Sequence, residues 1–159
     1  MTLYAGHLAR YLEAMNQLVR ACHGRGDATR LRPATPHELR ALRELGIRDP
    51  VLSLLAAAAP DSTCDLLIRF HDPAGIVHEN TKLGPGENIC PLGFPVIAST
   101  HSGDAFALDY NSPPAPDGTP RVLLVSHEQD AAAILAHALA VAESYIEFIE
   151  GAAADRYDY

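Results

Sequence analysis

The stretch VIASTHSGDAFALDY, residues 96–110, decides the fold class. Two apolar runs, 96–100 and 105–110, are joined by residues 101–104, which include the glycine and aspartate typical of turns. Within the second run, the large side chains alternate with smaller or polar ones, and this period of two is typical of a strand with one buried face. The stretch therefore predicts an antiparallel β-hairpin.

Strand signals also occur on both sides of this hairpin. Residues 64–70 alternate in the same way, the turn-like segment 72–75 follows, and the apolar segment 76–79 comes next. These segments predict a second hairpin in which 76–79 is the returning strand. Residues 121–125 form a short apolar run after the proline-rich segment 111–120, which predicts another strand preceded by an exposed loop.

The N-terminal third of the chain has helical spacing of its apolar residues. Residues 3–22 predict a first helix, with Thr2 as its N-cap. The segment TPHE, residues 35–38, has the sequence of a capping box with proline at the first helical position, and it predicts a second helix that ends at Gly46. The segment 49–58 predicts a third, shorter helix.

One long helix is predicted near the C-terminal end. Ser126 and Gln129 have the spacing of a second capping box. Residues 134–149 carry apolar side chains at helical spacing, and Gly151 is expected to end the helix. Residues 152–159 are expected to form a frayed tail.

The order of these elements predicts an α+β fold. Strands do not alternate with helices, as a doubly wound parallel sheet requires. We expect an antiparallel sheet of about four to six strands with helices packed on one face and a long C-terminal helix. A chain of 159 residues has the length of a single domain, with an N-terminal helix and connector over 1–34, a core over 35–150 and a tail over 151–159.

Composition and charge exclude several function classes. The net charge of −8 disfavours direct nucleic-acid binding, which needs clustered basic residues, and permits a basic partner. No stretch approaches the ~18–20 apolar residues of a membrane span, and the first ten residues do not resemble a secretion signal. We expect a cytoplasmic protein whose thiols are reduced. Lys82 is the only lysine among 12 basic residues, a bias typical of GC-rich bacterial coding sequences.

No catalytic or metal-binding pattern stands out. The chain lacks a glycine-rich phosphate loop that leads into a helix, and it lacks the zinc-site spacing of cysteines and histidines. We therefore expect no cofactor and no metal. A small enzyme that uses His101, Asp104 and His127 in a cleft stays open as an alternative.

Three segments together resemble the SUKH superfamily. Residues 92–109 resemble its signature hairpin, in which an apolar strand meets a Gly-Asp turn and the next strand ends in Leu-Asp. Residues 45–55 are similar to its Leu-Gly…Pro helix pair, and residues 144–149 are similar to its closing helix. The Gly-Asp is single where the family often doubles it, and the alanine run 56–59 replaces an expected Asn-Gly.

The resemblance implies an α+β fold, no enzymatic activity and a role in protein–protein interaction. Bacterial members of the family are typically immunity proteins that neutralise toxins, often nucleases or deaminases, and fungal members regulate cell-wall assembly. The predicted function is thus a non-enzymatic protein-binding module, most specifically a cytoplasmic immunity protein. An adaptor in a bacterial assembly is a further alternative.

Four acidic residues are predicted to bind the partner because turns and loops expose charges to other proteins. A nuclease toxin is basic around its substrate groove, so an acidic protein can compete for that groove. The predicted partner-binding residues are Asp104, Asp109, Asp117 and Glu128.

Overall fold

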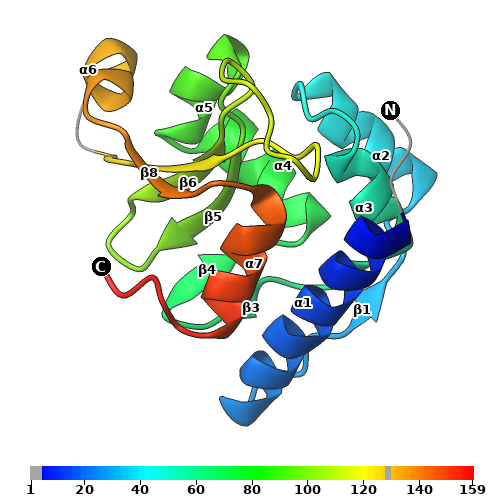
Figure 1. Ribbon diagram of the computed structural model, residues 1–159. Helices are drawn as coiled ribbons and strands as arrows, with labels where there is room; N and C mark the ends of the chain where they lie inside the picture. Colours follow the sequence, from blue (N-terminus) through cyan, green and yellow to red (C-terminus); the bar gives the residue numbers. More distant parts are fainter. Residues whose placement is uncertain (1–4, 128–129) are drawn as a thin grey trace.

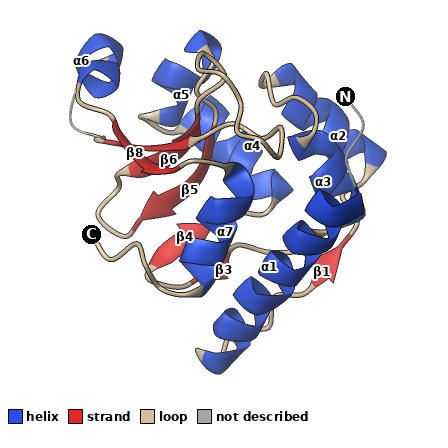
Figure 2. Ribbon diagram, in the orientation of Figure 1, coloured by secondary structure: helices blue, strands red, loops and turns tan. Residues whose placement is uncertain are grey.

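The computed structural model describes residues 5–127 and 130–159, and it has an α+β fold (Figure 1). Six strands form one antiparallel sheet in which neighbours in space are also neighbours in sequence. Figure 2 shows the strands in red. These strands are β3 (Cys64–Asp65), β4 (Ile68–Phe70), β5 (Val96–Thr100), β6 (Ala105–Leu108), β7 (Val122–Val125) and β8 (Leu139–Ala142). The predicted antiparallel sheet is confirmed.

Seven α-helices and one 3-10 turn lie within the described residues. They are α1 (Ala5–Gly24), α2 (Pro36–Glu44), α3 (Val51–Ala57), α4 (Pro73–Lys82), α5 (Gly86–Ile89), η1 (Cys90–Leu92), α6 (Ala131–Ala136) and α7 (Tyr145–Ala153). The predicted capping box of α2 is confirmed, since the Glu38 N–H donates to Thr35 Oγ1 over 3.2 Å and the Thr35 N–H donates to Glu38 Oε2 over 2.8 Å. Thr2, the predicted cap of α1, lies outside the described residues.

The predicted hairpin at residues 96–110 is β5 and β6. Ser99 pairs with Ala105, and a bulge lies between Val96 and Ala98. Gly103 takes a φ of 103°, a backbone conformation that favours glycine, and this allows the tight turn between the strands. Strand β6 ends at Leu108, two residues earlier than predicted.

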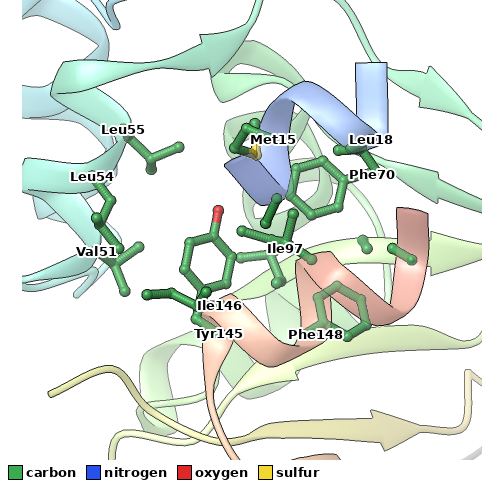
Figure 3. Packing of buried hydrophobic residues seen from close by; sticks show 14 of the residues in the cluster. Met15, Leu18, Val51, Leu54, Leu55, Phe70, Ile97, Tyr145, Ile146 and Phe148 are labelled. Atoms are coloured by element: carbon green, nitrogen blue, oxygen red, sulfur yellow. The ribbon is translucent and has the colours of Figure 1, made fainter. Parts of the chain in front are cut away.

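One face of the sheet packs against α1 and α7, which lie side by side in front of it in Figure 1. Figure 3 shows Phe148 of α7 close to Phe70 of β4, with Met15 and Leu18 of α1 nearby. Phe106 of β6 is fully buried there, with its ring centroid 5.1 Å from that of Phe148. These side chains form the larger of the two apolar cores.

The opposite face of the sheet is also covered, so the expectation of helices on one face only is wrong. Ile89 of α5 and Ile134 of α6 pack there against Ala107 of β6 and Leu123 of β7. The reason is visible in the strands, since every residue of β5 and β6 is buried. A strand that is apolar on both sides needs cover on both sides.

Residues 76–79, predicted as a strand, lie in helix α4. Asp72 is the N-cap of this helix and accepts a hydrogen bond from the Gly75 N–H over 3.1 Å, while Pro73 takes the first helical position. An Asp-Pro pair suits a helix start as well as a turn. Residues 64–70, predicted as one strand, instead form the short hairpin of β3 and β4.

The prediction of one long C-terminal helix is also wrong, because the structure divides this part of the chain into α6, β8 and α7. Asp130 caps α6 and Ser144 caps α7, each accepting a backbone N–H at about 3 Å. Between them, β8 pairs with β7 and completes the sheet. Residues 131–142 are rich in alanine, which carries little periodic information. Within this segment, pairing with β7 decides the structure of residues 139–142. Gln129, the predicted capping partner, lies outside the described residues.

The C-terminal tail and the connector before α2 are more ordered than predicted. Helix α7 continues through Gly151 to Ala153, and Tyr157 is buried with its ring centroid 5.0 Å from that of Phe148. In the connector, β1 (Leu31–Arg32) pairs with β2 (Ala59–Pro60) as a separate two-stranded sheet.

Candidate functional site

The structure separates the residues that were predicted to bind a partner. Asp104 lies in the turn at one end of β6, and Asp109 follows the other end of the same strand. The side chains of Asp109 and Asp117 are only 3% and 5% exposed, so the premise that loop positions expose them is wrong for these two. Glu128 lies outside the described residues.

Asp117 is buried because its carboxylate is used inside the loop. Its Oδ1 accepts hydrogen bonds from the Thr119 N–H over 2.9 Å and from the Thr119 hydroxyl over 2.7 Å. The sequence Asp117-Gly118-Thr119 is a signal for such an Asx turn, and it could have indicated a structural role.

At the hairpin turn, Asp104 and His127 form a close pair. Asp104 Oδ1 lies 2.7 Å from His127 Nδ1, and it also accepts the His127 N–H over 3.1 Å. The third residue of the enzyme alternative is placed differently, since His101 Nε2 contacts Leu66 O at 3.0 Å and Asp65 at 3.4 Å. The structure therefore brings together an acid and an imidazole, but it does not bring His101 into that pair.

Asp109 is the centre of a buried hydrogen-bond network. Its Oδ1 accepts the backbone N–H groups of Asn111 and Ser112, at 2.9 and 3.2 Å. Its Oδ2 accepts the Ser112 hydroxyl at 2.7 Å and Arg121 Nε at 2.8 Å. Burial by itself raises the pKa of Asp109, but these hydrogen bonds outweigh it and hold the pKa below its ordinary value. The carboxylate is therefore ionised at neutral pH and unsuited to donate a proton.

Beside Asp109 lies a surface hollow with a volume of about 450 Å³. The hollow adjoins the second apolar core, since Phe94, Leu123 and Leu135 belong to both. Its wall combines polar and apolar side chains: Phe94, Asp109, Asn111, Ser112, Arg121, Leu123, Leu135, Ala138 and Ala140. Sequence reasoning missed Arg121, because nothing local to the start of β7 marks it as the partner of Asp109.

A second group of carboxylates lies where the loop 111–120 meets the start of α7. We call it the acidic face, and it consists of Asp117, Glu143, Glu147 and Glu150. Arg10 of α1 holds Glu150 with two hydrogen bonds, at 2.7 and 2.8 Å, and its Nη1 lies 3.9 Å from Asp117. The hydrogen bonds with Glu150 raise the pKa of Arg10 above its ordinary value, although burial acts to lower it.

Part of the acidic face has a structural explanation. Glu147 lies in the first turn of α7 and accepts the Glu143 N–H over 2.8 Å, and acidic groups stabilise the N-terminus of a helix. Glu150 is paired with Arg10. Glu143 is exposed, and its carboxylate is the one most accessible to another protein.

The charge of the whole chain is unevenly divided. Residues 1–69 contain seven acidic and nine basic side chains, whereas residues 70–159 contain thirteen acidic and three basic ones, giving the net charge of −8. The negative charge of the protein therefore arises from the part that forms most of the sheet, α7 and the acidic face.

His71 lies in a buried cluster of polar side chains. Its Nε2 lies 3.0 Å from Ser99 Oγ and 3.3 Å from Glu79 Oε1, and its Nδ1 lies 3.4 Å from Thr63 Oγ1. Burial lowers the pKa of His71 to about 4 and raises the pKa of Glu79. In a catalytic triad the acid contacts one ring nitrogen of the histidine, and the serine contacts the other ring nitrogen. Here Glu79 and Ser99 share one nitrogen, so the geometry differs from a triad.

Within residues 5–127 and 130–159, two other kinds of site are absent. No group of three or more histidine, cysteine, aspartate or glutamate side chains is placed to hold a metal ion. No helix there is both long and apolar enough to cross a membrane. All three cysteines are buried as free thiols.

Comparison with known proteins assigns no family to the chain. No model of a protein family matches it. No curated protein matches it either.

Proposed function

We propose that this chain is a protein-binding module with a basic partner, and specifically a cytoplasmic bacterial immunity protein of the SUKH type that neutralises a toxin by direct contact. The observation that carries the proposal is the charge distribution. Thirteen of the 20 acidic side chains lie in residues 70–159, against three basic ones. Such an imbalance creates a field that attracts a positively charged partner.

Electrostatic attraction suits the task of an immunity protein. A toxin that acts on nucleic acid needs a basic groove for its substrate, and an acidic protein can occupy that groove. Complementary charge also raises the association rate, so a toxin is captured before it acts. The resemblance of the β5–β6 hairpin and its flanking helices to the SUKH superfamily supports the same role.

The contact residues in this proposal differ from those predicted from the sequence. Asp109 and Asp117 are buried and contribute only to the field. Glu143 on the acidic face is exposed, and Asp104 at the hairpin turn is partly exposed. These two are proposed to meet the partner.

A survival assay tests the function. A candidate toxin domain, sought beside the gene of this chain, is expressed in a sensitive bacterial host, with and without the chain. The proposal expects the chain to restore growth and to form a stable complex with the toxin domain. Growth that stays arrested, together with no complex between the purified proteins, would contradict the proposal.

A pair of matched variants tests the surface. Glu143→Lys reverses one charge on the acidic face, and Glu44→Lys makes the same change at the exposed end of α2. We expect the first variant to slow association with the toxin domain at least about threefold more than the second, because only local charge pairs depend on position. Equal effects would indicate that total charge alone matters.

A further inference from the structure

Arg121 lies on the wall of the 450 Å³ hollow with most of its hydrogen-bonding capacity unused. Its Nε–H donates to Asp109 over 2.8 Å, and its side chain is 40% exposed. Among the described residues, no acceptor takes a hydrogen bond from its Nη1 or Nη2. A guanidinium has five N–H donors, so about four are left for another group.

Asp109 has no capacity left for those donors. A carboxylate offers about four acceptor sites, and the N–H groups of Asn111 and Ser112, the Ser112 hydroxyl and Arg121 Nε fill them. Because Asp109 is buried and ionised, it fixes the orientation of the guanidinium. Arg121 is therefore a pre-oriented cation rather than a mobile surface arginine.

The wall of the hollow also has an apolar part, besides Arg121 and the polar side chains of Asp109, Asn111 and Ser112. Leu123 of β7, Leu135 of α6 and Ala140 of β8 face it together with Phe94. A volume of about 450 Å³ falls in the usual range of roughly 300–1,000 Å³ for sites of small ligands or single side chains. The site thus combines the Arg121 cation, held by Asp109, with an apolar surface.

We propose that this hollow binds a carboxylate carried on an apolar body, either the C-terminal residue of a polypeptide or a free aliphatic acid. The Nη1–Nη2 edge of Arg121 matches a carboxylate with two parallel hydrogen bonds. The apolar wall covers the attached side chain or aliphatic group. This site is separate from the acidic face and does not depend on the proposed function.

Titration of the isotope-labelled full chain tests the proposal. The probes are N-acetyl-leucine, the pentapeptide Gly-Gly-Ser-Gly-Leu and the same peptide with a C-terminal amide. We expect the two free acids to shift the backbone amide signals of Leu123, Ala138 and Ala140. The amide should bind about tenfold more weakly or worse, because it lacks the charge. Tighter binding of the peptide identifies a polypeptide terminus as the ligand, and equal affinity of the two acids identifies a free acid.

Variants separate binding from folding. Arg121→Gln removes the cation and should abolish binding, but it also leaves Asp109 without its ion pair. Ala140→Leu fills the hollow without touching that pair, and it should abolish binding while the melting temperature stays unchanged. Arg20→Gln, at an exposed position of α1, is the matched control and should bind normally.

Two outcomes would overturn this proposal. The first is the absence of any shift around the hollow with millimolar free acid. The second is equal binding of the acid and the amide. Neither result affects the toxin-binding proposal, because that proposal is tested by the survival assay and by the Glu143→Lys variant.

Discussion

Replacing Phe106 with alanine is expected to lower the free energy of unfolding by about 4 kcal/mol, within the range of about 3–5 kcal/mol for a fully buried phenylalanine. Phe106 is 0% exposed, and its ring centroid lies 5.1, 5.7 and 6.2 Å from those of Phe148, Tyr157 and Tyr159. Aromatic pairs add about 0.5–1.5 kcal/mol each beyond burial, which places the cost above the lower end of the range.

Chemical denaturation followed by circular dichroism measures this cost, and thermal unfolding provides a second estimate. For a domain of this size, 4 kcal/mol corresponds to a fall in melting temperature of roughly 8–16 °C. Phe94→Ala is the matched control, because Phe94 is only partly buried at the rim of the hollow and should lose clearly less. A loss below about 1 kcal/mol for Phe106→Ala would refute the placement of this ring between β6 and α7.

Three further predictions concern the tail, the buried histidine and metals. Tyr157→Ala should cost about 3 kcal/mol in chemical denaturation because its ring is buried against Phe148, whereas a frayed tail would lose almost nothing. The pKa of His71 is about 4 in the folded chain and an ordinary 6.5 in the unfolded chain, so as pH drops the unfolded chain binds a proton before the folded chain does. Stability should therefore be lost between pH 6.5 and 4, by about 3 kcal/mol, and His71→Gln should flatten this slope; an unchanged slope would contradict it. The pKa of Glu79 is raised in the folded chain, so its contribution to stability decreases as pH rises above the ordinary pKa of 4.5, which is the opposite pH dependence. Elemental analysis should find no stoichiometric metal, and chelators should leave the melting temperature unchanged; one zinc per chain would contradict this.

The parts of the fold that were predicted correctly depend on short-range signals. The hairpin of β5 and β6 has its turn residues and its period of two within one stretch of 15 residues. The capping box of α2 lies within four residues, Thr35 to Glu38. In both places, the local preference and the tertiary contacts agree.

The parts that were missed depend on contacts between distant segments. Residues 139–142 are a strand because β7 offers an open edge to pair with, and no local pattern shows that edge. Asp109 and Arg121 are separated by the proline-rich loop, so their ion pair and the hollow beside it emerge only when β6 and β7 lie together. The burial of Asp117 was missed because its Asx turn was not considered.

The association rate of the purified chain with the partner that we propose, a basic toxin domain, tests the central claim most directly. Stopped-flow fluorescence can follow it at several salt concentrations. If the acidic surface captures a basic partner, the rate should fall at least about tenfold between roughly 50 and 500 mM salt, and Glu143→Lys should lower both the rate and its dependence on salt. An association rate that is indifferent to salt and to this substitution would contradict the account.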